Sequence, residues 1–135
     1  SRPKGHLADT GLACYHARLS SSQMLASHPL FGALFETAMV QELQKQVAAM
    51  GVSVSWHHWR SAGGAEVDLL LEKDDTIYPF EFKLTTNPSR RDGSGIAAFK
   101  AAYPNRKVAK GAVICAVEQS RWISDEVLAI PWNLL

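Results

Sequence analysis

Several features that mark common protein classes are missing from this chain of 135 residues. It has only two cysteines, Cys14 and Cys115, which lie far apart among apolar or small residues. This usage is typical of buried thiols in a reducing cytosol, and a disulfide or zinc pair is the less favoured alternative. No apolar run approaches the roughly 20 residues of a membrane helix, and no secretory signal is visible. We therefore expect a cytoplasmic protein without a membrane partner.

Motifs of several enzyme classes are also absent. The chain contains no Gly-x-x-x-x-Gly-Lys-Ser/Thr phosphate loop, no Gly-x-Ser-x-Gly and no Cys–His nucleophile pattern, and its five histidines lack metal-finger spacing. A hydrophobic fraction of 47% and a charged fraction of 20% are ordinary for one globular domain. The chain starts at Ser1-Arg2-Pro3-Lys4 without an initiator methionine. We therefore expect a segment of a longer protein, whose other domains carry part of the function.

The charge is unevenly distributed. A net charge of +1 argues against a permanent nucleic-acid clamp. The stretch from Leu84 to Arg121, however, has two acidic residues, Asp92 and Glu118, against seven basic ones, namely Arg90, Arg91, Lys100, Arg106, Lys107, Lys110 and Arg121. A basic flank of this kind suits an anionic partner, and a solvated surface is an equally good alternative.

Hydrophobic periodicity and turn residues predict an α/β domain. Pro29 and Gly51 bracket the main helix, and Pro104 ends the second one. We expect a lead-in over residues 1–26, weakly helical from Leu12 to Leu25, and a single domain over residues 27–135. The expected elements are a helix at Leu30–Met50, strands at Val52–Trp59, Glu66–Glu72 and Ile77–Lys83, a helix at Ile96–Tyr103, and strands at Ala112–Val117 and Val127–Ile130. This order predicts a mixed sheet with helices packed on it.

An acidic hairpin is the most informative part of the sequence. A tight turn centred on Asp74-Asp75 places Asp68 directly across from Glu81, and Glu66 across from Lys83. On this reading Val67 and Leu69 share the opposite face of the first strand, as Phe80 and Phe82 do on the second. Directly opposed residues have β-carbons about 4.5–5.5 Å apart, and like charges there are destabilising.

Two carboxylates held this close require a cation or a shared proton. Mg²⁺ or Mn²⁺, bound by Asp68 and Glu81 with water, is the predicted cofactor. Lys83 could then polarise an attacking water or stabilise charge on a phosphate. The alternative is an exposed hairpin face with a Glu66–Lys83 ion pair, which leaves the opposed Asp68 and Glu81 unexplained.

Glu36 is a third candidate ligand. It shares its helix face with Val40 and Leu43, and it is the only charged residue from Leu30 to Val40. A carboxylate in a core-facing stripe costs several kcal/mol unless it is paired or bound to a metal. The alternative is an ion pair with a buried or half-buried arginine, for which Arg60 is the candidate.

These residues, in this order, resemble a known pattern. Glu36 on a helix, Gly64-Ala65-Glu66-Val67-Asp68 and Glu81-Phe82-Lys83 resemble the PD-(D/E)xK, or restriction-endonuclease-like, nuclease superfamily with its αβββαβ core. Together with Asp9-Thr10-Gly11-Leu12, Phe35-Glu36 and Trp59-Arg60, they look like the C-terminal domain of unknown function of prokaryotic AAA-type ATPases, over residues 4–130. Val67 stands where many superfamily members have proline.

The resemblance implies Mg²⁺-dependent hydrolysis of phosphodiester bonds, with DNA as the expected nucleic acid. Asp68 and Glu81 would be metal ligands, Lys83 would lie beside the water, and Glu36 would be an accessory acid and third ligand. It also implies an N-terminal AAA-type ATPase module in the same parent chain. The accessory or nucleic-acid-binding residues would be Glu66, Arg60, Arg90, Arg91 and Lys100.

Two other functions stay open at this point. The first is a catalytically inactive nuclease-fold module that binds nucleic acid or a protein partner for the ATPase. The second is a structural domain that assembles oligomers.

Overall fold

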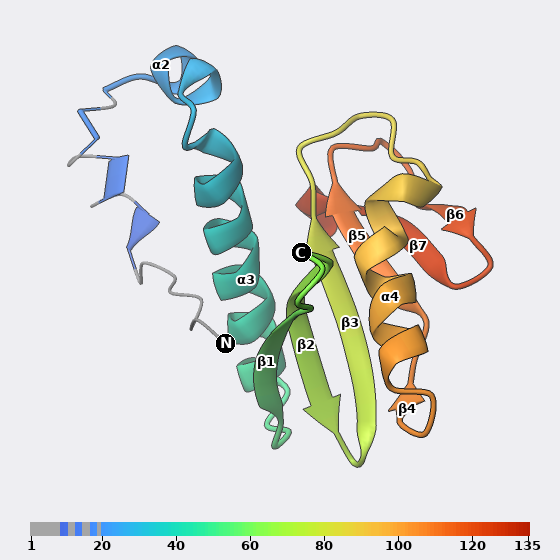
Figure 1. The fold of residues 1–135 in the computed structure, drawn as a ribbon. Coiled ribbons are helices and arrows are strands. Elements are labelled where there is room, and N and C mark those ends of the chain that lie inside the picture. The colour runs from blue at the N-terminus through green and yellow to red at the C-terminus, as the bar shows by residue number, and fades with distance from the viewer. Residues whose placement is uncertain (1–8, 11–12, 15–16, 19) are drawn as a thin grey trace.

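The computed structural model describes residues 9–10, 13–14, 17–18 and 20–135. Its centre is a mixed seven-stranded sheet in the order β1-β2-β3-β5-β7-β6, with β4 paired to β3. Helix α3 covers one face and helix α4 the other (Figure 1). The elements are α2 (Ser22–Ser27), α3 (Phe31–Ala49), β1 (Ser55–Arg60), β2 (Glu66–Lys73), β3 (Thr76–Phe82), η1 (Arg90–Gly93), α4 (Ser94–Ala102), β4 (Lys107–Val108), β5 (Gly111–Cys115), β6 (Arg121–Ser124), β7 (Val127–Pro131) and η2 (Trp132–Leu134). The predicted α/β class, with a mixed sheet flanked by helices, is confirmed.

Both main helices lie where the sequence predicts them. Helix α3 follows Pro29 and ends before Gly51, whose φ of 67° is a left-handed conformation that favours glycine. Helix α4 ends two residues before Pro104, because proline cannot continue a helix.

Two apolar layers hold the helices against the sheet. On one face, α3 packs residues of a single stripe onto the sheet; the buried members of this layer are Val40, Leu43, Val47, Leu69, Leu71, Phe82, Ala112 and Ile114. On the other face, Ile96 and Phe99 of α4 pack on Val67, Leu70, Ile77 and Val113. Because both faces are covered, β5 is buried along its whole length.

The hairpin of β2 and β3 has the predicted turn and register. Asp74 and Asp75 have φ values of 50° and 62°, which are the two left-handed residues of a type I′ turn. The paired positions run from Lys73↔Thr76 to Leu69↔Phe80. This confirms the predicted register over the length of the ladder and places Phe80 and Phe82 on the face of α3.

The predicted face assignment in β2 is wrong at one point. Val67 packs with the α4 layer, whereas Leu69 packs with the α3 layer. The cause is a β-bulge: β1 pairs His57 with Leu70 and Trp59 with Val67, so His58 alone faces both Asp68 and Leu69. The extra residue shifts the pleat of β2 by one position, and it does so at Asp68.

Two short strands were not predicted. Strand β4 pairs with β3, and β6 pairs with β7 at the edge of the sheet. The partly exposed Arg-Trp-Ile-Ser segment of β6 lacks the buried alternation from which strands are predicted. The weak helix predicted over Leu12–Leu25 lies partly outside the described residues, which contain α2 from Ser22 to Ser27. Within the described residues, no helix is both long and apolar enough to cross a membrane.

Candidate functional site

Strands β2 and β3 separate at the bulge. Their ladder ends at Leu69↔Phe80, and β3 continues alongside β5 up to Phe82↔Ile114. Beyond the last rung, the main-chain N–H of Phe82 donates a 2.9 Å hydrogen bond to Oδ2 of Asp68. The carboxylate of Asp68 thus replaces a main-chain acceptor at the point where the two strands diverge.

Asp68 and Glu81 are brought together in this opening. Each is only 4% exposed, and their charges interact, since Asp68 raises the pKa of Glu81. Lys83, two residues along the same strand, places its Nζ 3.4 Å from Oε2 of Glu81. The structure therefore gathers Asp68, Glu81 and Lys83 at one end of the hairpin, whereas the sequence paired Glu66 with Lys83.

Burial dominates the electrostatics of the pair. Burial, helped by the charge of Asp68, raises the pKa of Glu81 from its ordinary 4.5 to about 7, although Lys83 opposes the rise. Burial lowers the pKa of Lys83, but Glu81 and Asp68 outweigh it and the net shift is upward. The charges of Lys83, Glu81 and Asp68 are therefore coupled to one another.

The donor atoms at this opening fit a hard divalent cation. Asp68 and Glu81 supply carboxylate oxygens, and Oε2 of Glu81 lies on the side of Lys83, whose side chain is 38% exposed. Two carboxylates, with the remaining positions left to water or phosphate oxygens, are a common way for proteins to bind Mg²⁺. Among the described residues, no group of three or more His, Cys, Asp or Glu side chains is arranged to hold a metal. The predicted set of Glu36, Asp68 and Glu81 is therefore not assembled as one cluster here.

Glu36 lies on the stripe predicted for it. It precedes Val40 by one helical turn on α3, and its Oε1 has no exposed surface. Arg60, its candidate partner, lies instead 3.9 Å from Glu66 through its Nε. Glu36 as a third ligand stays a prediction.

The predicted basic residues occupy other places. Arg90 and Arg91 are exposed in η1, whose first turn is closed by a 2.7 Å bond from the Ser89 N–H to Asp92. Lys100 on α4 forms an ion pair with Glu126 of the β6–β7 turn. Arg90 and Lys100 line one cavity of about 380 Å³ between α4 and that turn.

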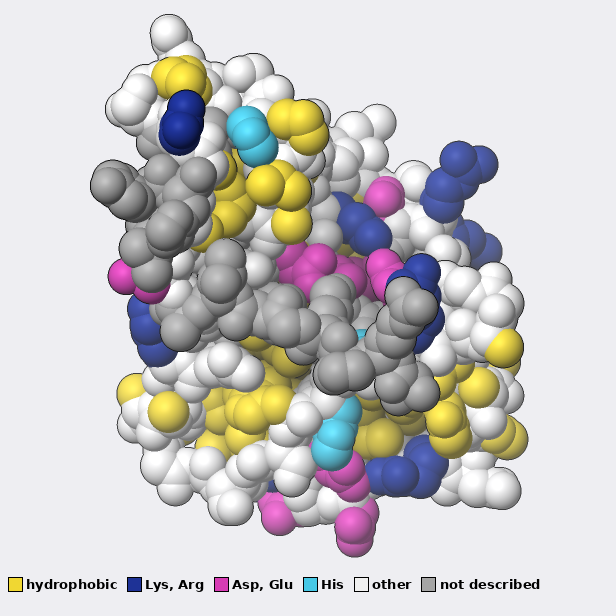
Figure 2. All heavy atoms as spheres, turned by 60° about the vertical axis from the view of Figure 1, so that its left-hand side comes forward, with side chains coloured by type: hydrophobic (Ala, Val, Ile, Leu, Met, Phe, Trp, Pro, Cys, Tyr) yellow, Lys and Arg dark blue, Asp and Glu magenta, His cyan; other side chains and the backbone are white. Residues whose placement is uncertain are grey.

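A group of acidic side chains lies in the middle of one face of the molecule, and further ones lie at its edges. In Figure 2 this central group lies beside basic side chains. Apolar side chains gather above it. The acidic and apolar groups are therefore neighbours on one surface.

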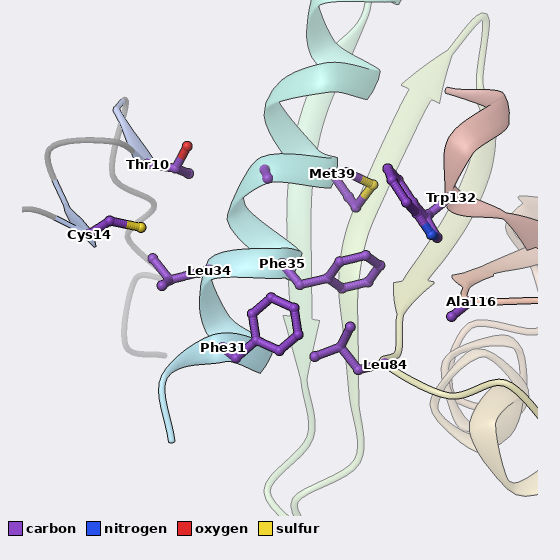
Figure 3. Close-up of a pocket in the computed structure, with 10 residues that line it drawn as sticks. Thr10, Cys14, Phe31, Leu34, Phe35, Met39, Leu84, Ala116 and Trp132 are labelled. Carbon is purple, nitrogen blue, oxygen red and sulfur yellow. The ribbon is translucent and has the colours of Figure 1, made fainter. Parts of the chain in front are cut away.

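An apolar pocket was not predicted from the sequence. The pocket has a volume of about 540 Å³ and lies between the first half of α3, Leu84 and the C-terminal η2. The residues that line it are Thr10, Cys14, Phe31, Leu34, Phe35, Ala38, Met39, Leu84, Ala116 and Trp132. In Figure 3, Phe35 and Met39 point from α3 toward Leu84 and Trp132. The signal in the sequence was a second apolar stripe, Phe31-Leu34-Phe35-Ala38, at helical spacing beside the stripe that carries Val40.

Comparison with known proteins places the chain among domains whose role has not been assigned. The model of the family described as "Domain of unknown function (DUF4143)" matches residues 31–135. The chain is 29% identical over 129 residues, or 96% of its length, to the uncharacterized proteins Mb2031c of Mycobacterium bovis and Rv2008c of Mycobacterium tuberculosis. It spans only 27% of the length of these relatives. No solved structure matches the chain.

Proposed function

The chain belongs to the DUF4143 family, and we propose that it is a metal-dependent nuclease domain that hydrolyses phosphodiester bonds of DNA. The observation that carries the proposal is the buried pair of Asp68 and Glu81, with Lys83 beside it, where β2 and β3 separate. A buried pair of carboxylates is costly unless a cation or a proton compensates it. The pair, with Lys83 beside it, is therefore the place where a divalent cation would bind in the working protein.

Each residue has a task that follows from its position. Asp68 is fixed through Oδ2 by the Phe82 N–H, and its carboxylate would be one ligand of a cation. Glu81 offers Oε2, the oxygen that lies toward Lys83. A bound Mg²⁺ would polarise the phosphate and lower the pKa of an attacking water. Lys83, which is 38% exposed, can orient that water or stabilise the charge that develops on the phosphate.

Three further roles belong to the same proposal. Glu36 on α3 would act as an accessory acid, and the exposed Arg90 and Arg91 would contact the phosphate backbone. The PD-(D/E)xK superfamily supplies the reaction class, because the acid, the Asp and the Glu-x-Lys occur here in its order. An AAA-type ATPase in the same parent chain is the proposed regulator, and relatives much longer than this chain leave room for such a module.

The first experiment is Mn²⁺ titration by calorimetry on the wild type and on Asp68→Asn, each with and without a short DNA oligonucleotide. The oligonucleotide is needed because a substrate phosphate can complete a metal site that has only two protein carboxylates. We expect saturable binding by the wild type and none by the variant. Cleavage of linear, supercoiled and branched DNA is then compared for the wild type and Glu81→Ala, and the variant should be inactive. Wild-type protein that binds no Mn²⁺ under either condition contradicts the proposal.

One observation favours a second candidate, a nuclease-fold module that binds nucleic acid or a protein partner without cleaving. The net charge of only +1 is low for a domain that acts on DNA. For this candidate, Glu81→Ala should leave DNA binding by the chain unchanged, and neither protein should cleave. Binding and cleavage assays on the same pair of proteins therefore separate the two functions.

A further inference from the structure

The first turn of α4 approaches the acidic pair at Gly95. A β-carbon built at Gly95 would lie 1.8 Å from the main-chain oxygen of Glu66 and 2.5 Å from Oε1 of Glu81. Carbon and oxygen atoms that are not bonded do not approach so closely, so any side chain at this position must displace the helix, β2 or the carboxylate. The absence of a side chain at Gly95 is thus what allows α4 to rest on Glu81.

Other glycines of the described region make a different kind of contact. A β-carbon at Gly93 would meet the methyl groups of Val127 at 3.1 and 3.2 Å. One at Gly111 would meet Cδ1 of Ile96 at 2.6 Å and Cγ of Pro79 at 3.3 Å. These neighbours are apolar side chains, whereas the neighbours of Gly95 are a main-chain oxygen and the buried carboxylate of the acidic pair.

The two oxygens of Glu81 are therefore in unequal positions. Oε1 faces Gly95, is buried, and accepts no hydrogen bond of good geometry among the described residues, although the Ile96 N–H lies close enough to the carboxylate to lower its pKa. Oε2 faces Lys83, whose side chain is 38% exposed. The backbone of α4 therefore lies against Oε1, whereas Oε2 lies on the side of the partly exposed Lys83.

We propose that Gly95 is a positioning residue for Glu81: by letting α4 close over Oε1, it fixes the carboxylate so that Oε2 alone is presented to a cation. Glu81 then binds the cation through one oxygen, and the remaining coordination positions are available to Asp68, water and substrate phosphate. The inference deepens the proposed nuclease function and rests on it for the identity of the cation. The position of the carboxylate itself can be measured without any metal.

The test compares Gly95→Ala with Gly93→Ala. Each variant adds one methyl group at the start of α4, and each should lower the melting temperature. Gly95→Ala pushes against the main-chain oxygen of Glu66 and against Glu81, whereas Gly93→Ala pushes against the methyl groups of Val127. The second variant therefore controls for general loosening of α4.

Two quantities are measured on each folded variant. One is the Mn²⁺ dissociation constant from calorimetry, and the other is the side-chain carboxyl ¹³C resonance of Glu81 in metal-free protein. We expect Gly95→Ala to weaken Mn²⁺ binding about tenfold or more, as substitutions that misorient a ligand do, and to shift the Glu81 resonance. Gly93→Ala should leave both close to the wild type. An unchanged Glu81 resonance in Gly95→Ala, or an equal change in Gly93→Ala, overturns the inference.

If Gly95→Ala does not fold, Glu81→Asp tests the same contact without adding volume. Glu81→Asp keeps the charge but withdraws the carboxylate from α4 by one methylene group. The amide resonances of Gly95 and Ile96 should then shift more than that of Gly111, and equal shifts contradict the inference. If wild-type protein binds no Mn²⁺, the proposed function fails, and the Glu81 and Gly95 resonances still decide whether α4 positions the carboxylate.

Discussion

The main-chain N–H of Phe82 donates a 2.9 Å hydrogen bond to Oδ2 of Asp68, in the place where a regular hairpin would have a main-chain acceptor. Asp68 can reach this position because the bulge at Asp68 and Leu69 turns it into the gap between the strands. The Asp68 carboxylate therefore has two roles: it accepts the last hydrogen bond from the backbone of β3 on this side, and it is a candidate metal ligand.

Replacement of Asp68 should separate these two roles. Asp68→Ala leaves the buried Phe82 N–H without an acceptor, and we expect it to lower the free energy of unfolding by about 1–3 kcal/mol. Asp68→Asn keeps an oxygen acceptor and should lower it by less than about 1 kcal/mol. Both variants should lose Mn²⁺ binding. Urea unfolding and calorimetry on the same samples provide the measurements, and an Asn variant as unstable as the Ala variant contradicts the assigned role of the hydrogen bond.

Part of this site could be predicted from the sequence because local rules determine it. Asp74 and Asp75 tolerate the left-handed backbone of a type I′ turn, and the turn fixes which residues of β2 and β3 are paired. The alternation of Phe80 and Phe82 with Glu81 and Lys83 then excludes a slip by one residue. The proximity of Asp68 and Glu81 follows from these two local features.

The rest depends on contacts between segments that are distant in the sequence. The bulge arises from pairing with β1, and the continuous Val-Asp-Leu-Leu-Leu run of β2 gives no sign of which residue is extra. In the sequence, Gly95 is one of several glycines and serines in a polar loop. Its contact with Glu81 forms only when α4 packs on the sheet. The apolar stripe that contains Glu36 could be predicted from the sequence. Helical periodicity, however, does not determine the distance between the Glu36 carboxylate and Asp68.

Stability should fall with pH because of Glu81. Its folded pKa of about 7 lies above the ordinary value of 4.5, so the folded state holds the proton more tightly than the unfolded state. The resulting contribution to stability is fully present below pH 4.5 and is lost as the pH rises to about 7. Glu81→Gln carries no charge at any pH and should be more stable than the wild type above pH 7.

The measurement is the difference in unfolding free energy between the wild type and Glu81→Gln, by urea, at several pH values from 4 to 8.5. The difference should grow across the window from 4.5 to 7 and then stay constant. Glu118→Gln, at an exposed glutamate outside the hairpin, provides the matched control. A difference that does not depend on pH would show that Glu81 titrates alike in the folded and unfolded chains.

A glycine in the turn of the β2–β3 hairpin should stabilise the protein. Asp75 has a φ of 62°, and glycine adopts this region without steric cost, so Asp75→Gly should stabilise the protein by about 0.5 kcal/mol. Asp75→Val should destabilise it by about 1–2 kcal/mol, because a β-branched side chain crowds the backbone there. Thermal unfolding measures both changes. Neither variant should alter Mn²⁺ affinity, since the turn is at the opposite end of the ladder from Leu69, and an altered affinity would contradict a site confined to the Asp68 end.

Lys83 should have opposite effects on metal binding and on cleavage. In the metal-free protein its Nζ lies 3.4 Å from Oε2 of Glu81, the oxygen proposed for the cation, so the ammonium group competes with a divalent ion for the same carboxylate. Lys83→Met keeps the length of the side chain and removes the charge. We expect the variant to bind Mn²⁺ about tenfold more tightly, which corresponds to the loss of roughly 1.4 kcal/mol of competing interaction. We expect no detectable DNA cleavage.

Calorimetry and a cleavage assay on the same preparation test this expectation. Lys45→Met, at a lysine of α3 whose side chain is 73% exposed, removes one positive charge at a distance from the hairpin and serves as the control for net charge. It should change neither quantity, because exposed charges are screened by solvent and salt. Weaker Mn²⁺ binding in Lys83→Met would mean that the lysine orients Glu81 for the cation instead of competing with it. Lys83 would then be a support for the carboxylate, and its role beside the water would need another residue.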